Sequence, residues 1–316
     1  MKKIFIPVIV GPTASGKTAL SIELAKKYNA EIVSADSMQI YTSMDIATAK
    51  PTKDEMQGIP HHLIDFVSPD TIFSLADYVK CANRVIRDID LRGKMPLMVG
   101  GTGLYIDTVI DNITLTETKT DYELRKKLQS QAEKLGNEAM WKRLYEVDEK
   151  TAGLLHPNNI GRIIRALEVY EQTGVPISKH NEESRMEKSP YFPVFIGLDY
   201  KDREILYDRI NRRVDLMLEN GLLEEAQEIY NKKDRKDTSF QAIGYKELVP
   251  YFEGIKTLEE CVEILKQKTR NYAKRQLTWF RKNERINWIY SDECGNFENV
   301  LEKAQNFVEI FMEKCK

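Results

Sequence analysis

Gly11-Pro12-Thr13-Ala14-Ser15-Gly16-Lys17-Thr18 follows the pattern G-x-x-x-x-G-K-[ST] of a phosphate-binding loop. Residues 4–10 directly before it are apolar and rich in β-branched side chains, which predicts a buried strand. After the loop, Leu20, Leu24 and Ala25 recur on one face of a helix. This motif requires a strand before it and a helix after it, so the context favours a true phosphate site over a chance match.

The chemistry of the loop follows from its residue types. Gly11 and Gly16 allow the backbone to turn so that its N–H groups converge on a phosphate, and the N-terminus of the following helix adds partial positive charge. Lys17 supplies a point charge, and the hydroxyl of Thr18 is suited to bind Mg²⁺. We therefore expect residues 11–18 to hold phosphate groups, with Mg²⁺ as the cofactor.

The composition is that of a soluble globular protein, since 30% of the 316 residues are charged and 42% are hydrophobic. No apolar run reaches the roughly 18 residues of a membrane span, and the first predicted strand begins without a signal peptide before it. The four cysteines form no C-x-x-C pair and no zinc-binding spacing. We expect a cytoplasmic protein with no membrane partner.

Predicted strands and helices alternate in the N-terminal part. We expect a second strand at residues 31–37, a helix at 74–92 with Ser74 as its N-cap, and a short strand with a glycine turn at 96–103. This alternation predicts an α/β fold, a parallel sheet flanked by helices as in P-loop nucleoside triphosphate hydrolases. Because ligands bind at the carboxyl ends of such strands, Asp36 is expected to face the phosphate loop, unless it only forms a turn.

The pattern changes near residue 113. Four helices are predicted without a strand between them, at residues 122–135, 138–147, 150–155 and 159–173. The later part is predicted to contain a strand at 191–198, helices at 201–220, 222–231, 243–252 and 258–285, a strand at 286–290 and a C-terminal helix. We therefore expect one core from residues 1–114 and 189–316, interrupted by an all-helical insertion domain at residues 115–188.

The position of the carboxylate argues against ordinary nucleotide hydrolysis. P-loop hydrolases carry an acidic residue after a second apolar strand. Here the comparable strand ends in Gly100-Gly101-Thr102, and the carboxylate is Asp36, after the preceding strand. This arrangement favours a diphosphate leaving group over a nucleoside triphosphate that is hydrolysed.

Basic residues gather near the C-terminal end. Between residues 264 and 285, eight Lys and Arg residues accompany a single acid, Glu284, and Tyr272, Trp279 and Phe280 lie among them. A basic helix with interleaved aromatics is typical of a nucleic-acid contact. A solvated helix face with aromatics turned to the core explains the segment equally well. In the insertion, Arg162 and Arg165 are three residues apart and hence on one helix face.

Seven further segments make the pattern specific, because they occur in order with the phosphate loop. They are Ala35-Asp36-Ser37-Met38-Gln39-Ile40-Tyr41, Thr48-Ala49-Lys50-Pro51, Pro60-His61-His62-Leu63-Ile64-Asp65, Val99-Gly100-Gly101-Thr102-Gly103-Leu104-Tyr105, Arg165-Ala166-Leu167-Glu168-Val169, Gln241-Ala242-Ile243-Gly244-Tyr245-Lys246 and Arg275-Gln276-Leu277-Thr278-Trp279-Phe280. Over about residues 5–290 the chain resembles the tRNA dimethylallyltransferases. It resembles the bacterial type, since it carries no C-terminal zinc finger.

The resemblance implies transfer of a dimethylallyl group from dimethylallyl diphosphate to the exocyclic N6 amine of the adenine immediately 3′ of the anticodon. The products would be diphosphate and N6-(dimethylallyl)adenosine in tRNA. The implied partners are the anticodon stem-loop of tRNA and dimethylallyl diphosphate, and a monomer is expected. The alternative is an ATP-dependent small-molecule kinase that uses the same loop. A non-enzymatic RNA-binding module would leave the phosphate site without a purpose.

The resemblance also implies residue roles. Asp36 would take the proton of the amine, which is a poor nucleophile because its lone pair is delocalised into the ring. Thr102 would lie near the reacting centre and Lys17 would stabilise the leaving group. The donor would bind residues 11–18 and, from the segment Arg209-Ile210-Asn211-Arg212-Arg213, the side chain of Arg213. Contacts with tRNA are expected from Asp36, Ser37, Met38, Gln39, Thr102, Gly161, Arg162, Ile163, Ile164, Arg165, Gln241, Ala242, Ile243, Gly244, Tyr245, Lys246, Lys274 and Arg275.

Overall fold

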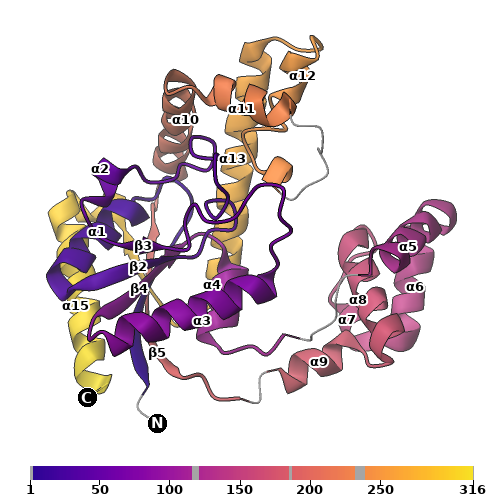
Figure 1. Cartoon of the computed structure of the whole chain (residues 1–316), viewed down its shortest axis with the longest axis horizontal. Helices are drawn as coiled ribbons and strands as arrows, with labels where there is room; N and C mark the ends of the chain where they lie inside the picture. The colour runs from indigo at the N-terminus through magenta and orange to yellow at the C-terminus, as the bar shows by residue number, and fades with distance from the viewer. Residues whose placement is uncertain (1–2, 116–120, 185–186, 232–238, 316) are drawn as a thin grey trace. The chain divides into compact units, whose positions relative to one another are not determined.

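The structure is a computed structural model that describes residues 3–115, 121–184, 187–231 and 239–315. The chain forms two compact units (Figure 1). The core unit consists of Met1–Ile110 and Pro190–Lys316, and the insertion unit of Asp111–Ser189. The expected insertion at residues 115–188 lies inside the second unit.

The core unit contains a six-stranded sheet in the order β3-β2-β4-β1-β5-β6, in which every pair of neighbours is parallel. The strands are β1 (Ile4–Val10), β2 (Ala30–Ser34), β3 (His61–His62), β4 (Met95–Gly100), β5 (Tyr191–Asp199) and β6 (Ile286–Tyr290). The predicted α/β class with a parallel sheet is therefore confirmed. The central strand β1 ends at the phosphate loop, next to the ends of β4 and β5.

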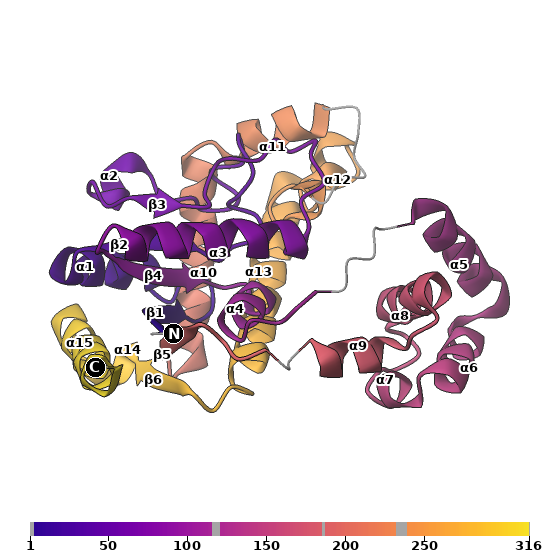
Figure 2. The ribbon, with the colours of Figure 1, turned by 60° about the horizontal axis from the view of Figure 1, so that its bottom comes forward.

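Helices cover both faces of the sheet (Figure 2). On one face, α3 (Leu75–Leu91) and α4 (Gly103–Ile110) pack with Tyr78, Ile86 and Ile106 against Val8 and Met98 of the sheet. On the other face, α1 (Lys17–Tyr28) and α15 (Phe297–Cys315) pack against residues of opposite parity, such as Ile9 and Val99. Alternate strand residues point to opposite faces, so the continuous apolar runs of β1 and β4 supply both cores.

A third cluster joins the loops after β2 to helices from the last third of the chain. The helices are α10 (Arg203–Glu219), α11 (Leu222–Asn231), α12 (Val249–Phe252) and α13 (Leu258–Phe280), with a 3₁₀ turn, η1 (Ser239–Gln241), between α11 and α12. Tyr41, Met44, Leu222, Tyr245 and Leu265 are buried in it. The short helices α2 (Lys53–Met56) and α14 (Ser291–Cys294) complete the core unit. These loops and helices build the walls of the site described below.

Several predicted elements end earlier than expected. The second strand stops at Ser34, because the side chain of Asp36 accepts the N–H groups of Met38 and Gln39 and turns the chain. Helix α13 ends at Phe280 rather than at residue 285. The helix predicted for residues 243–252 is wrong before Val249: Gly244 has φ of +115°, and its N–H is bound by the Glu247 carboxylate. Ser74 does cap α3, with Asp77 as the reciprocal partner.

All regular secondary structure among the described residues of the insertion unit is helical. Its helices are α5 (Tyr122–Leu135), α6 (Asn137–Val147), α7 (Glu149–Gly153), α8 (Ile160–Thr173) and α9 (Ile177–Glu183), and α9 was not predicted. Leu128, Leu144 and Leu167 belong to a small core of their own. Glu168 is fully buried and accepts hydrogen bonds from Arg125 and Arg165, which compensates the cost of burying its charge.

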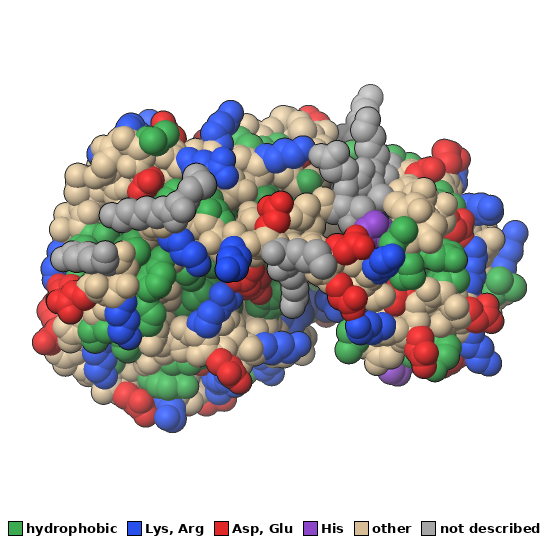
Figure 3. Space-filling model, turned by 90° about the horizontal axis from the view of Figure 1, so that it is seen from below, with side chains coloured by type: hydrophobic (Ala, Val, Ile, Leu, Met, Phe, Trp, Pro, Cys, Tyr) green, Lys and Arg blue, Asp and Glu red, His purple; other side chains and the backbone are tan. Residues whose placement is uncertain are grey.

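The surface carries charges of both signs. On the face shown in Figure 3, basic and acidic side chains are interspersed with apolar ones, in keeping with a formal net charge of −2. An interaction with a polyanion therefore depends on local groups of basic residues rather than on overall charge. Among the described residues, no helix combines the length and the apolar character needed to cross a bilayer.

Candidate active site

The phosphate loop joins β1 to α1, and its backbone requires its glycines. Gly11 has φ of +149°, and a Cβ atom on it would lie 2.4 Å from the carbonyl oxygen of Leu198 in β5. Gly16 has φ of +94° and is the N-cap of α1. Only glycine fits at the first position without strain. Lys17 and Thr18 consequently lie in the first turn of α1, where the backbone N–H groups have no partner within the helix.

Two side chains of the loop, those of Lys17 and Ser15, can donate hydrogen bonds to a bound anion. The Nζ of Lys17 donates a hydrogen bond to the carbonyl oxygen of Pro12 at 2.7 Å. Ser15 is buried, and the described residues offer its Oγ no hydrogen-bond partner. Buried hydroxyls are almost always paired. The unpaired hydroxyl of Ser15 therefore indicates that the loop is built around a further acceptor.

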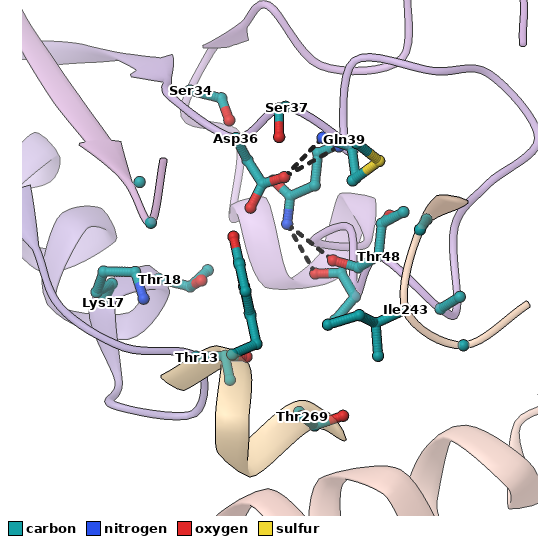
Figure 4. Close-up of a pocket in the computed structure, with 18 of the residues that line it drawn as sticks. Thr13, Lys17, Thr18, Ser34, Asp36, Ser37, Gln39, Thr48, Ile243 and Thr269 are labelled. Carbon is teal, nitrogen blue, oxygen red and sulfur yellow. Dashed lines mark hydrogen bonds between the residues drawn. The ribbon is translucent and has the colours of Figure 1, made fainter. Parts of the chain in front are cut away.

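A cavity of about 330 Å³ opens beside the loop. The predicted site residues that line it are Thr13, Lys17, Thr18, Asp36, Ser37, Met38, Gln39, Arg213, Gln241, Ala242, Ile243, Gly244, Lys246 and Arg275. The side chains of Lys17, Thr18 and Asp36 face this one space (Figure 4). The loop and the carboxylate that follows β2 thus belong to a single site.

The pKa values of the cations in the cavity depend on burial and on the neighbouring charges. Burial and the nearby Arg213 guanidinium lower the pKa of Lys17 from 10.5 to about 7, although the Asp36 carboxylate acts in the opposite direction. Burial likewise lowers the pKa of Arg213. Two desolvated cations therefore share the cavity with one carboxylate. A polyanionic ligand would relieve their repulsion and restore the charge of Lys17.

The two carboxylate oxygens of Asp36 differ in their hydrogen bonding. Oδ1 accepts hydrogen bonds from the backbone N–H of Met38 at 2.9 Å and of Gln39 at 3.3 Å. Within the described part of the chain, Oδ2 has no hydrogen-bond partner, and the carboxylate lines the cavity. One oxygen is used to hold the loop, and the other is available to a ligand.

Thr102 does not line the cavity, although a position near the reacting centre was predicted for it. Its Oγ1 accepts the backbone N–H of Ser37 at 3.2 Å, and its own N–H donates to the carbonyl of Ala35 at 3.1 Å. Thr102 lies at the turn between β4 and α4, and these bonds attach that turn to the residues on either side of Asp36. Thr102 thus bonds to Ser37, a residue that lines the cavity.

The arginines of α10 differ in direction. Arg213 is half-buried and lines the cavity. Arg212 points to solvent, with 73% of its side chain exposed, and pairs with Asp208. Arg209 donates from Nε to the carbonyl of Ala14 in the phosphate loop at 3.0 Å. The choice of Arg213 over Arg212 as a donor ligand is therefore consistent with the side-chain positions.

Helix α13 also lines the cavity with Tyr272 and Gln276, neither of which was predicted as a site residue. The side chain of Gln276 is buried and joins the phosphate loop to the turn after β4, at Gly101. Its only sequence signal was its place in the segment 275–280 that carried the family resemblance. No spacing rule connects residue 276 with residues 11–18, so its contact could not be derived.

The basic segment contains side chains that pack inside the core unit and side chains that reach the cavity or the surface. Phe280 is buried in the core, and Lys266 pairs with Asp215 at 2.7 Å. Arg275 lines the cavity, whereas Lys274 is exposed with its Nζ 5.4 Å from the ring centre of Tyr207. The helix is therefore a structural element whose middle part also faces the site.

Some predicted tRNA contacts belong to hydrophobic cores. Ile163 and Ile164 are buried inside the insertion unit, while Gly161 and Arg162 are exposed. Tyr245 is buried in the core unit and does not line the cavity. Five consecutive helical residues cannot share one face, so the buried side chains of Ile163 and Ile164 are not placed to touch a ligand, and the tRNA contacts of Gly161, Arg162 and Arg165 stay a prediction.

Mg²⁺ fits the chemistry of the donor groups. The Thr18 hydroxyl and the Asp36 carboxylate both line the cavity, and Mg²⁺ is usually held by one or two protein oxygens together with substrate phosphates and water. Among the described residues there is no group of three or more His, Cys, Asp and Glu side chains that could hold a metal alone. A metal here would need oxygen ligands from a bound phosphate.

Comparison with known proteins gives a consistent result. A model of the family described as IPP transferase matches residues 39–283. The chain is 50% identical over 316 residues to a tRNA dimethylallyltransferase of Caldanaerobacter subterraneus subsp. tengcongensis, covering 98% of each chain.

Two solved structures are similar over nearly the whole chain. One is the full-length tRNA isopentenylpyrophosphate transferase of Bacillus halodurans, with 44% identity, a TM-score of 0.75 and coverage of 99% of this chain and 98% of that one. The other is a eukaryotic dimethylallyltransferase acting on tRNA, with 31% identity, a TM-score of 0.85 and coverage of 98% and 80%.

Proposed function

This chain belongs to the IPP transferase family of tRNA dimethylallyltransferases, and from this premise we propose how its cavity performs the reaction. It is a transferase that prenylates tRNA. We propose that dimethylallyl diphosphate is the donor and that the N6 amine of the adenine immediately 3′ of the anticodon is the acceptor. The carbon–oxygen bond to diphosphate breaks, the N6–carbon bond forms, and one proton leaves the amine.

The observation that carries the proposal is the shared cavity. Lys17, Thr18 and Arg213 line it at the phosphate loop, and Asp36 lines it from the end of β2. A cationic end and a carboxylate in one cavity suit a reaction in which diphosphate leaves and a proton is taken up. Hydrolysis of a nucleoside triphosphate would not need the carboxylate at this place.

The phosphate loop acts on the leaving group. Negative charge grows on the diphosphate oxygens as the allylic carbon–oxygen bond breaks. Backbone N–H groups at the start of α1, the Ser15 hydroxyl and the cations of Lys17 and Arg213 stabilise that charge where it develops. Mg²⁺, held by Thr18 together with the diphosphate, would neutralise further charge on the same oxygens.

Asp36 acts as the base. Its Oδ1 holds the turn to Met38, so the orientation of the carboxylate is set before substrate binds. Its Oδ2 takes the N6 proton as the new bond forms, which removes the positive charge that the amine would otherwise carry.

The acceptor adenine must leave its stack in the anticodon loop to reach the cavity. We infer that the segments Ser37–Gln39 and Gln241–Lys246 receive it, since most of their residues line the cavity. Arg275 and Lys274 of α13, and Arg162 of the insertion unit, would contact the tRNA backbone. We expect the enzyme to work as a monomer in the cytoplasm, on tRNA.

The two alternative functions find no support. The relatives are transferases acting on tRNA rather than kinases. A binding module without activity would not explain Lys17, Arg213 and Asp36 in one cavity.

The test is direct. The protein is incubated with labelled dimethylallyl diphosphate and bulk tRNA, and in parallel with labelled ATP and a mixture of metabolites. We expect label in tRNA from the prenyl donor only. Transfer from ATP to a small molecule, without prenylation of tRNA, would contradict the proposal.

A further inference from the structure

Glu225 on α11 does not line the cavity, yet its carboxylate accepts four hydrogen bonds. Oε2 accepts the backbone N–H groups of Asp45 and Ile46, each at 2.8 Å. Oε1 accepts the N–H of Ala47 at 2.9 Å and the hydroxyl of Tyr245 at 2.8 Å. Three successive N–H groups and one phenol are thus gathered on a single side chain from a different part of the chain.

The groups that Glu225 binds belong to two segments of the cavity wall. Ala47, Thr48 and Ala49 line the cavity on one segment, and residues 241–244 together with Lys246 line it on the other. The two segments touch, because a Cβ atom on Gly244 would lie 2.7 Å from the Cβ of Ala47. Glu225 lies behind this contact and ties its two sides together. We call residues 45–49 and 241–246 the acceptor wall.

The acceptor wall is connected to Asp36 by hydrogen bonds. Gln39 donates from Nε2 to the carbonyl oxygens of Thr48 and Ala49, at 3.2 and 3.1 Å (Figure 4). The backbone N–H of Gln39 donates to Oδ1 of Asp36 at 3.3 Å. A continuous series of bonds therefore runs from Glu225, outside the cavity, to the carboxylate that faces it.

The chemistry of these bonds makes Glu225 hard to replace. Hydrogen bonds to a charged acceptor are stronger than neutral ones, and here one carboxylate satisfies three neighbouring backbone donors. Burial and the Glu225 charge raise the pKa of Tyr245 well above its ordinary value, so the phenol remains a donor. A Gln side chain has the same shape, but its amide would place N–H groups against N–H or O–H groups on one side.

We propose that Glu225 is a positioning residue of the transfer site, which fixes the acceptor wall and thereby the place of the acceptor base, without touching a substrate. This inference rests on the proposed function. Its effect falls on the acceptor, because the residues that Glu225 binds belong to the acceptor wall and none belongs to residues 11–18. Loss of the carboxylate should loosen the wall and leave the phosphate loop intact.

The test compares Glu225→Gln with Glu228→Gln. Glu228 is exposed on the same helix, loses the same charge, and has no hydrogen-bond partner among the described residues. In Glu225→Gln we expect hydrogen exchange of the amides of residues 45–47 to accelerate, and the KM for tRNA to rise, each on the order of tenfold. Binding of inorganic diphosphate and the KM for dimethylallyl diphosphate should stay within about twofold. Glu228→Gln should match the wild type in every measurement.

Tyr245→Phe serves as a second variant, because it removes one of the four bonds and keeps the carboxylate. We expect a smaller rise of the tRNA KM in the same direction, with little change in the exchange of residues 45–47. Unchanged hydrogen exchange in Glu225→Gln, or an equal rise of its KM values for tRNA and for dimethylallyl diphosphate, would overturn the proposal. If Glu225→Gln fails to fold, wild-type kinetics of Tyr245→Phe would overturn it as well. If the wild type transferred nothing, the proposed function would fail, while the exchange comparison would still judge the role of Glu225 in the wall.

Discussion

Gln276 accepts a hydrogen bond from the backbone N–H of Thr13 at 2.9 Å, across a sequence separation of 263 residues. Its Nε2 donates to the carbonyl oxygen of Gly101 at 3.1 Å. A Cβ atom on Gly101 would lie 2.1 Å from that Nε2, so the close approach requires glycine. One buried amide of α13 thus holds the phosphate loop and the turn after β4 at a set distance from each other.

Replacement of Gln276 should therefore affect both stability and the donor site. Gln276→Ala leaves the Thr13 N–H and the Gly101 carbonyl without a partner, which we expect to cost about 1–3 kcal/mol of unfolding free energy. Urea denaturation measures this loss, and titration with inorganic diphosphate measures the expected weakening of the loop. Gln267→Ala, exposed on the same helix, is the control and should change neither quantity.

Binding of diphosphate should be linked to protonation of Lys17. With a pKa of about 7 in the ligand-free protein, Lys17 is mostly neutral at pH 8, and a bound polyanion favours its charged form. We expect proton uptake on binding at pH 8, much less at pH 6, and an affinity that falls as the pH rises above 7. Calorimetry in two buffers of different ionisation enthalpy measures the uptake. Lys17→Ala should bind more weakly, transfer more slowly and show less uptake; equal uptake in both proteins would speak against this assignment.

The two neighbouring arginines of α10 provide a matched pair. Arg213→Ala removes a half-buried cation from the cavity and should weaken diphosphate binding by roughly 10–100-fold, as expected for loss of a charge-assisted contact. Arg212→Ala removes the same charge at the surface, where Arg212 pairs with Asp208, and should bind like the wild type. If Arg212→Ala bound diphosphate more weakly and Arg213→Ala bound it like the wild type, Arg212 would be the arginine that contacts the donor.

The base can be tested with a variant that keeps the turn. In Asp36→Asn, Oδ1 still accepts the N–H of Met38, but the side chain can no longer take a proton. We expect the single-turnover rate to fall by roughly 10²–10⁴-fold, with tRNA affinity within a few-fold of the wild type. Asp54→Asn, on the exposed helix α2, is the control. A parallel loss of affinity or stability would instead identify Asp36 as a residue that only orders its loop.

The insertion unit offers a further contrast between neighbouring basic residues. Arg162 is exposed, so Arg162→Glu should raise the KM for tRNA and leave the KM for dimethylallyl diphosphate unchanged. The salt dependence of tRNA binding should fall by the equivalent of about one phosphate contact. Arg165 is one of two cations bound to the fully buried Glu168. Arg165→Glu should therefore destabilise the unit, which thermal melting detects. Salt-insensitive tRNA binding in the wild type would count against this surface.

Periodicity and turn chemistry were sufficient for most local features. The boundaries of β1, α5 and α11 agree with the prediction to the residue, and Ser74 caps α3 as expected, because these features depend on neighbours in the sequence. The loop at residues 11–18 was recognised from its motif, and its Lys17 and Thr18 line the cavity, while their roles stay predictions. The prediction failed for residues 243–248, where Gly244 and the Glu247 carboxylate favour a turn over a helix whose apolar spacing is otherwise regular.

The sequence by itself determined the class of fold, the phosphate loop and the family, because each depends on residues that are close in the chain or on motifs in a fixed order. Only the tertiary structure decided which side chains meet. It brought Gln276 to Thr13 and Glu225 to Ala47, turned Arg213 into the cavity and Arg212 away from it, and buried Ile163 and Ile164. The physical reason is that such contacts depend on how helices pack onto the sheet and onto each other, and neither propensity nor spacing specifies that packing.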